Sequence, residues 1–283
     1  GAADFILLFF LTLLGILILY PFYNAFLVSI VPNTVYLRYQ GLMLWPPEVT
    51  MEAYTFTFKS SLIWYGYKNS ILITFFGTIY NMILTVLCAY ALTKPIPGGK
   101  FIRFAIVFTM YFSGGLIPSY LLIKDLKLMD TIASMILPTG INIMYMLIIS
   151  NYFKSLPPAL EESAKIDGAT DLRILWSVIL PLSLPLLATF TLYYAVERWN
   201  EWYLAMLYVK SVQKWPLQNV LRTIINDVNM MATQNIPGQA KPDIQGDSIK
   251  MSSIIVAMAP IMCLYPFLQR YFLSGLTLGA VKE

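Results

Sequence analysis

The 283-residue chain is 58% hydrophobic and only 12% charged, and its mean hydropathy is +0.67. Soluble domains carry roughly 25% charged residues, so this composition excludes a water-soluble fold and places the chain in a bilayer. The formal net charge of +4 is small and its bases are scattered, which argues against a nucleic-acid partner. The chain has no histidine, and Cys88 and Cys263 lie in apolar runs, so neither a metal site nor a disulfide is expected.

Six apolar runs are each long enough to cross the hydrocarbon core, which requires about 20 helical residues. They predict an all-α, multi-pass membrane protein that forms a single transmembrane domain over residues 1–283. The first run ends near Pro32, where the sequence VPN breaks a helix. A cleaved signal peptide is the alternative for that run, but the run is too long and lacks a basic flank. The predicted spans cover about residues 5–31, 69–93, 104–123, 131–153, 176–199 and 251–270.

The short loop KPIPGGK between the second and third runs indicates the orientation. It contains Lys94 and Lys100, Arg103 follows it, and it has no acid. Lysine and arginine concentrate in short cytoplasmic loops, so both chain termini are expected on the cytoplasmic side of a bacterial inner membrane. The outer segments hold more bases in total, but bases in long segments have little influence on the orientation of a membrane protein. The inner side would also hold Lys154, Lys165, Arg173, Arg270 and Lys282.

A long polar segment, residues 209–250, precedes the last apolar run. It is too polar for a span, and its helical periodicity around residues 220–228 is too regular for a linker. We expect it on the outer face, either as a passive cap or as a docking surface.

Residues 161–173, EESAKIDGATDLR, interrupt the apolar sequence with four acids and two bases. Pro157 and Pro158 suit the first turn of a helix, and Gly168 permits the positive φ that ends one. Thr170 can cap a second helix that begins at Asp171. These signals predict two short helices joined at an angle over residues 157–178. The alternative is an ordinary polar loop whose charges stay hydrated.

The same segment resembles the EAA loop of ATP-binding-cassette (ABC) importer permeases. Glu162-Ser163-Ala164 is followed by three residues, Gly168, nine residues and VILP. The family pattern has alanine at position 163 and isoleucine at position 178, and both departures are small. The segment LMDTIASMILP, in which Asp130 is the expected helix N-cap, and the segments RWNEW and PFLQRYFLSGLTLGAVKE resemble the carbohydrate-uptake branch. Within that branch the chain is similar to the maltose importer's smaller permease and to subunits that handle acidic sugars such as alginate.

The resemblance implies a type I importer permease fold with six transmembrane helices and a cytoplasmic EAA elbow. Such a subunit forms half of the translocation pathway for an oligosaccharide, and the similarity to alginate importers implies an acidic oligosaccharide. Its partners are a second homologous permease, a dimer of ATPase subunits that bind ATP and Mg, an extracytoplasmic solute-binding protein that would meet residues 209–250, and membrane lipid. The chain itself is expected to be no enzyme and to bind no cofactor, because IPGGK lacks the phosphate-loop spacing.

The resemblance also assigns roles to residues on the inner side. The expected ATPase-coupling residues are Glu161, Glu162, Ser163, Ala164, Asp167, Gly168 and Ala169, with Glu162 paired to a base of the ATPase. The expected C-terminal ATPase contacts are Gln269, Arg270, Gly279 and Lys282, although Arg270 and Lys282 can equally be simple cytoplasmic anchors.

Polar residues inside the spans are the candidates for a substrate path, because intramembrane polarity requires a partner or a cavity. Sugars bind to aromatic faces, amides and carboxylates, and Arg198 would neutralise an acidic sugar. The alternative for the tyrosines and tryptophans is anchoring at the membrane interface. The candidates are Asn142, Tyr145, Tyr193, Tyr194, Glu197, Arg198, Trp199 and Asn200, with Tyr111, Ser113 and Tyr120 in the third span.

A secondary, ion-driven transporter or a channel for a small solute is the competing function. A proton-driven carrier would be expected to hold acids deep in its spans, and the charge-free parts of the six runs contain none. A membrane-embedded enzyme is disfavoured because the chain lacks histidine and any convincing pair of catalytic carboxylates.

Overall fold

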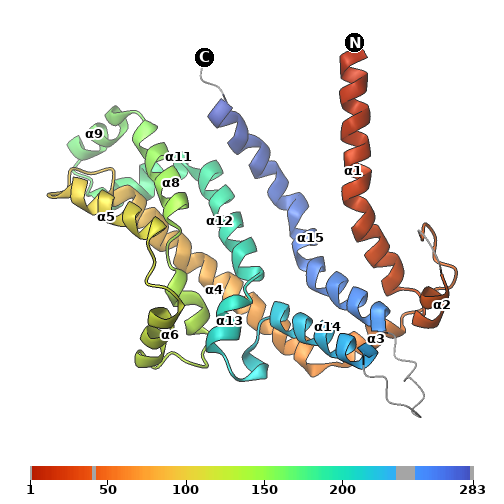
Figure 1. Cartoon of the computed structure of the whole chain (residues 1–283). Helices are drawn as coiled ribbons and strands as arrows, with labels where there is room; N and C mark the ends of the chain where they lie inside the picture. Colours follow the sequence, from red (N-terminus) through yellow and green to blue (C-terminus); the bar gives the residue numbers. More distant parts are fainter. Residues whose placement is uncertain (1, 40–42, 234–245, 281–283) are drawn as a thin grey trace. The chain divides into compact units, whose positions relative to one another are not determined.

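The computed structural model describes residues 2–39, 43–233 and 246–280, with side chains for 4–39, 43–230 and 246–263. Over these residues the chain is all-α, as predicted (Figure 1). It forms two compact units: unit 1 comprises Gly1–Gly66 and Leu217–Cys263, and unit 2 comprises Tyr67–Pro216 and Leu264–Glu283.

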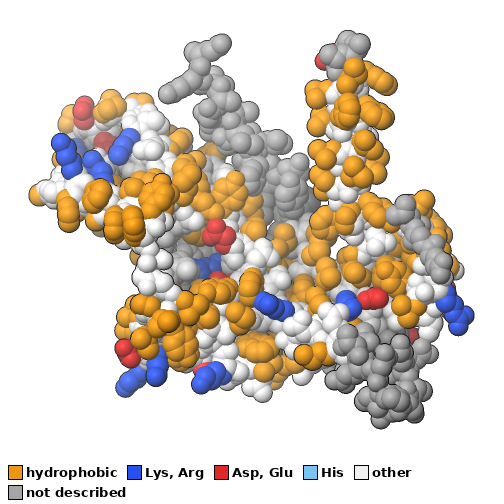
Figure 2. Space-filling view, viewed as in Figure 1, with side chains coloured by type: hydrophobic (Ala, Val, Ile, Leu, Met, Phe, Trp, Pro, Cys, Tyr) orange, Lys and Arg blue, Asp and Glu red, His pale blue; other side chains and the backbone are white. Residues whose placement is uncertain are grey.

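Unit 1 contains α1 (Ala2–Ser29), α2 (Asn33–Arg38), α3 (Glu52–Lys59), α14 (Leu217–Thr233) and the first part of α15 (Gly246–Ala280). The side chains of α1 are nearly all apolar, Figure 2 shows apolar side chains along the visible face of this helix, and the 18-residue apolar window within Asp4–Ser29 is 0% buried. A helix that is apolar on all sides requires lipid or protein around it.

The other helices of unit 1 pack through small contacts. Ala53, Val228 and Ile249 form a buried cluster between α3, α14 and α15. Beside it, the hydroxyl oxygens of Thr57 and Ser252 lie 2.9 Å apart in a buried hydrogen bond. Interhelical hydroxyl pairs of this kind satisfy polar groups inside a membrane protein.

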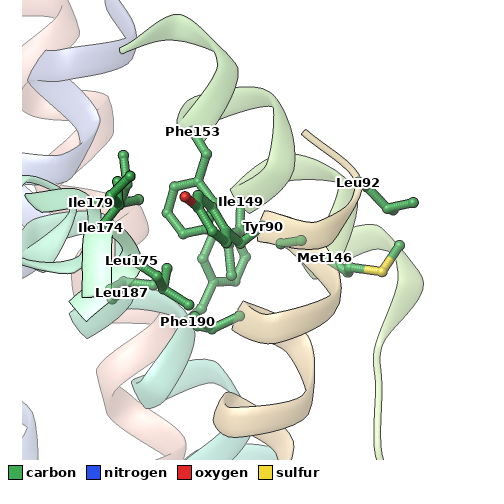
Figure 3. Packing of buried hydrophobic residues seen from close by; sticks show 12 residues of the cluster. Tyr90, Leu92, Met146, Ile149, Phe153, Ile174, Leu175, Ile179, Leu187 and Phe190 are labelled. Atoms are coloured by element: carbon green, nitrogen blue, oxygen red, sulfur yellow. The ribbon is translucent and has the colours of Figure 1, made fainter. Parts of the chain in front are cut away.

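Unit 2 is organised around α4 (Ser61–Ala91), α8 (Ile143–Ser155) and α12 (Leu184–Trp199). α4 has 31 residues and, at about 1.5 Å per residue, is longer than the roughly 30 Å hydrocarbon core. Figure 3 shows the buried cluster where these helices meet, with the rings of Tyr90 and Phe153 edge to face at 6.4 Å.

Three of the six predicted spans are single unbroken helices, over Asp4–Ser29, Ser61–Ala91 and Gly246–Cys263. The other three are bent pairs, a feature that the length of an apolar run does not predict. The pairs are α5 (Gly99–Tyr111) with α6 (Leu116–Asp125) at 109°, α7 (Ala133–Ile136) and η1 (Leu137–Thr139) with α8 at 51°, and α10 (Asp171–Ile174), η2 (Leu175–Ile179) and α11 (Leu180–Leu182) with α12 at 88°.

Each bend has a local cause. Gly115 adopts φ 87° between α5 and α6, a conformation that disfavours side chains with a Cβ. Pro138 and Gly140 interrupt the fourth span, and Pro185 follows Ser183 at the break before α12. Proline removes a backbone donor and clashes with the preceding turn. Counted with each bent pair as one span, the described residues contain up to six helical segments that are long and apolar enough to cross a membrane.

Asp130 does not cap a helix, and that prediction is wrong. The residue adopts φ 57° and its carboxylate binds the loop between α13 (Tyr203–Tyr208) and η3 (Val212–Lys214). Oδ1 accepts hydrogen bonds from the backbone N–H groups of Lys210 (3.0 Å) and Ser211 (2.8 Å), and Oδ2 accepts from the Ser211 hydroxyl (2.6 Å) and Lys214 Nζ (2.9 Å). Asp130 therefore ties two loops of unit 2 together.

We expect Asp130→Asn to lower the thermal stability of the protein in detergent by about 2 kcal/mol, the usual cost of losing hydrogen bonds to a charged group. Hydrogen bonds from Ser211 and Lys214 lower the pKa of Asp130 well below its ordinary value. The contribution is therefore complete above the ordinary pKa of about 4 and is lost as the pH falls below it. Melting curves of wild type and variant should differ at neutral pH. Asp125→Asn, at an exposed acid, is the control. A melting temperature of Asp130→Asn equal to that of wild type, or a decrease that Asp125→Asn matches, would contradict the role of Asp130 in joining the two loops.

Candidate functional site

A cavity of about 360 Å³ lies within unit 2. Three elements supply its walls: the middle of α4, the break between η1 and α8, and the C-terminal end of α12. Most of the lining side chains are polar or charged, and Pro138 and Ile141 add apolar surface. The lining residues are Asn81, Pro138, Thr139, Ile141, Asn142, Tyr194, Glu197, Arg198 and Glu201.

Arg198 holds the interrupted fourth span in place. The residue is 4% exposed, and its guanidinium donates to the carbonyls of Met135 (2.8 Å), Ile136 (3.2 Å) and Thr139 (2.8 Å). The last carbonyls of a helix lack intrahelical partners, and the planar fork of arginine supplies several donors at once. The expectation that Arg198 neutralises an acidic sugar is not supported, because its donors are directed at the protein's own backbone.

Asn81 completes this network and is not among the residues predicted from the sequence. Its Oδ1 accepts from Arg198 Nε at 2.8 Å, and its Nδ2 donates to the carbonyls of Thr139 (2.5 Å) and Gly140 (2.8 Å). The signal for it is present in the sequence, since an amide in the middle of the second apolar run requires a partner or a cavity.

Tyrosines support the other wall of the cavity. Tyr194 Oη is hydrogen bonded to Thr85 Oγ1 (2.7 Å) and accepts from the Asn142 N–H (2.9 Å). Tyr145 Oη donates to Glu197 Oε1 at 2.5 Å, and its ring packs on Tyr193 with centroids 5.7 Å apart. Of the predicted path residues, four line the cavity and Tyr145 and Tyr193 lie directly behind them.

The remaining predicted path residues do not line this cavity. Trp199 is buried with its ring 6.3 Å from that of Tyr67, and the Asn200 amide donates to Val196 of its own helix. Tyr111 and Ser113 lie at the exposed bend after α5, and Tyr120 packs on Tyr208. Glu201, in contrast, lines the cavity without having been predicted to do so, and its Oε1 accepts from the Leu204 N–H at 2.9 Å.

The charged segment of residues 157–178 forms the predicted bent pair of short helices. α9 (Pro158–Ile166) starts after Pro157, and Gly168 adopts φ 76°. The N–H groups of Gly168 and Ala169 donate to the carbonyls of Lys165 (3.0 Å) and Ala164 (2.9 Å), which is the Schellman arrangement. The Thr170 hydroxyl then caps α10 by accepting from the Arg173 N–H. We call residues 157–178 the elbow.

Lys94 braces the elbow from the loop after α4. Its Nζ contacts Glu161 Oε2 and lies 3.4 Å from Asp171 Oδ1, on the other side of the turn. It also lies 4.3 Å from the centroid of the Tyr90 ring. Burial alone would lower the pKa of Lys94, but hydrogen bonds to Glu161 and Tyr90 outweigh it and raise the pKa, so the brace stays charged.

The predicted elbow residues differ in exposure. Glu161 is engaged by Lys94, whereas Glu162, Ser163, Asp167 and Gly168 are exposed. Ala164 and Ala169 pack against the core of unit 2. Figure 2 shows charged side chains gathered at this end of the unit. The elbow is therefore anchored on one side and open on the other.

Two further predicted regions are only partly described. Gln269, Arg270 and Gly279 lie on the part of α15 for which side chains are not described, and Lys282 lies outside the described residues. Residues 209–250 comprise η3, α14 and the start of α15, while 234–245 lie outside the described residues.

Comparisons with known proteins identify the family. Residues 70–277 match the family described as "Binding-protein-dependent transport system inner membrane component". The chain is 38% identical over 281 residues, 99% of this chain and 98% of the relative, to the polygalacturonan/rhamnogalacturonan transport system permease protein YtcP of Bacillus subtilis (strain 168). It is 41% identical to protein LplC of the same organism over 249 residues, 87% of this chain and 83% of the relative.

A solved structure agrees with these relatives. It is a chain of a bacterial ABC transporter involved in the import of the acidic polysaccharide alginate, with TM-score 0.86, 32% sequence identity and 96% of each chain covered. The chain therefore belongs to the family of inner-membrane components of binding-protein-dependent transport systems, as an ABC importer permease of type I, which is a transport component and not a catalytic enzyme.

Proposed function

We propose that this chain is the permease subunit of an ATP-driven importer of oligosaccharides, and that acidic oligosaccharides are its substrate class. The observation that carries the proposal is the elbow, in which two short helices are joined at Gly168 and Glu162 is an exposed acid. Family membership supports the proposal, because the family comprises inner-membrane components of binding-protein-dependent transport systems. The substrate class is supported by the relatives, which are named for polygalacturonan, rhamnogalacturonan and alginate transport.

In this proposal the elbow is cytoplasmic and docks on a separate ATPase dimer. ATP and Mg bind to that dimer, since the chain carries no phosphate-loop sequence. Closure of the dimer moves the elbow and favours one state of the pathway over the other, to the extent that the ATPase binds the two states with different affinity. The expected C-terminal contacts, Gln269, Arg270, Gly279 and Lys282, would add to this interface, with both termini cytoplasmic.

On the outer side, a solute-binding protein would deliver the sugar to residues 209–250, and a second permease would supply the other half of the pathway. The cavity of unit 2 is the proposed contact of this chain with the sugar. Asn142, Tyr194 and Glu197 offer the amide, phenol and carboxylate groups that recognise sugar hydroxyls.

The proposal is tested by purifying the chain with its neighbouring transporter subunits and reconstituting them in proteoliposomes with the binding protein. ATP hydrolysis should be stimulated by binding protein loaded with acidic oligosaccharides more than with neutral ones of equal length. Uptake driven by an ion gradient without ATP would contradict the proposal and favour the secondary transporter.

Reversal of one charge tests the ATPase contact. We expect Glu162→Lys to reduce co-purification of the ATPase at least about tenfold, because a like charge facing a base of the partner is unfavourable. Glu162 is exposed, so the variant should remain folded. Asp125→Lys reverses an exposed acid on α6, away from the elbow, and serves as the matched control. Equal recovery of the ATPase with both variants would remove Glu162 from the interface.

A further inference from the structure

We propose that the cavity of unit 2 is a charge-selective subsite, which binds the hydroxyl edge of a sugar unit and repels a sugar carboxylate. This inference rests on the function proposed above and refines it. In this inference the chain contacts the uncharged hydroxyl groups of an acidic oligosaccharide. The carboxylates of that oligosaccharide then face away from this wall of the pathway.

The charged side chains around the cavity are the first support for this inference. Glu197 and Glu201 are its acids and Arg198 is its base, so the lining has a net formal charge of −1. The charge of Arg198 is included in this sum, but its donors are not available to a ligand, because its guanidinium makes four hydrogen bonds to the chain itself. A ligand in the cavity therefore meets carboxylates and no uncommitted cation among the described lining residues.

The second support is that Glu197 and Asn142 each keep a polar atom that can form a hydrogen bond with a ligand. Tyr145 donates to Oε1 of Glu197, which leaves Oε2 able to accept from a ligand. Asn142 uses its Oδ1 to cap α8 by accepting from Met144 and Tyr145, which leaves its amide nitrogen able to donate. A carboxylate oxygen and an amide NH₂ on one cavity match a pair of sugar hydroxyls, each of which can both donate and accept. A carboxylate ligand could not accept anything from Glu197.

The apolar part of the lining completes the fit. Pro138 and Ile141 lie on the broken segment of the fourth span, whereas the two acids lie at the end of α12 and just after it. Sugar rings carry apolar C–H faces between their hydroxyls, and binding sites combine apolar walls with a few oriented polar groups. The subsite thus selects by charge rather than by size.

The test compares two probes with the same sugar backbone: trigalacturonate, whose carboxylates are charged, and its methyl ester, whose carboxyl groups are neutral. Initial uptake of each is measured in proteoliposomes with the complete importer and saturating binding protein, and the acid-to-ester ratio is recorded. We expect Glu197→Gln and Glu201→Gln each to raise this ratio about tenfold, since removing a like charge relieves an unfavourable contact. Because the binding protein is the same throughout, its own preference cancels between variants.

Two controls separate charge from structure. Tyr145→Phe removes the hydrogen bond to Glu197 but keeps the carboxylate, and Asp125→Asn removes an exposed acid outside the cavity. Both should leave the ratio within about twofold of wild type. The two glutamine variants are independent of each other, so the test still gives a result if one of them fails to fold.

Import of both probes at a ratio that neither glutamine variant changes would overturn this inference alone. A ratio that rises equally in Tyr145→Phe would assign the effect to structure and also overturn it. If neither probe is imported or stimulates ATP hydrolysis, the proposed function fails and the subsite falls with it.

Discussion

We expect Gly168→Val to uncouple ATP hydrolysis from uptake while leaving the spans folded. Gly168 adopts φ 76° in the turn between α9 and α10, and a β-branched residue in this region costs about 1–3 kcal/mol. A Cβ at this position meets no atom within 4 Å, so the penalty comes from the backbone and not from crowding. A destabilisation of that size lowers the equilibrium constant for forming the bent turn by about 5–150-fold. Uptake and ATP hydrolysis measured in the same proteoliposomes would reveal the loss.

Two substitutions make this result specific. Gly98 has almost the same backbone, φ 72° with no neighbour within 4 Å of a Cβ, but lies in the loop before α5. Gly98→Val therefore carries the same strain outside the elbow and should keep transport. Gly168→Asn should keep it as well, because asparagine tolerates the left-handed region. Normal uptake per ATP in Gly168→Val would contradict a role of the turn in coupling.

Loss of Arg198 is expected to have the largest effect on stability. Arg198→Met removes donors from the carbonyls of Met135, Ile136 and Thr139 and from Asn81, inside the protein. Each buried acceptor left without a partner costs about 1–3 kcal/mol, and breaking a buried charged network costs about 3–5 kcal/mol in total. The variant should show little folded protein by size-exclusion chromatography and a much lower melting temperature.

Arg198→Lys should recover only part of the stability, because an ammonium cannot reproduce the planar fork of donors. Arg103→Met is the matched control: Arg103 is exposed and donates to the Leu92 carbonyl at 3.1 Å. Its melting temperature should stay close to that of wild type. An Arg198→Met protein that melts like the control would show that the broken span does not depend on this network.

The features that the sequence predicts well are those with local causes. The elbow follows from Pro157, Gly168 and Thr170, each of which acts within one helical turn, and the structure confirms all three roles. The six apolar runs follow from composition, which determines where a helix can contact lipid.

The features that escape prediction depend on partners far away in the chain. Asn81 and Arg198 are 117 positions apart and meet only because α4 and α12 pack together. Asp130 satisfies the local rule for a helix N-cap, but Lys214, 84 positions away, binds its carboxylate instead. The bends escape because hydropathy averages over a window and does not register a glycine at φ 87° between two apolar helices.

The brace at Lys94 gives the elbow a second mechanical attachment. Along the backbone the elbow continues through α10, η2 and α11 into α12, which carries Glu197 and Arg198. Through Lys94 it is also tethered to the end of α4, which carries Asn81. In the proposed coupling, a movement of α9 would therefore be transmitted to α4 and to α12 at the same time. These two helices form two walls of the cavity, and the hydrogen bond from Arg198 to Asn81 could stay intact while they move.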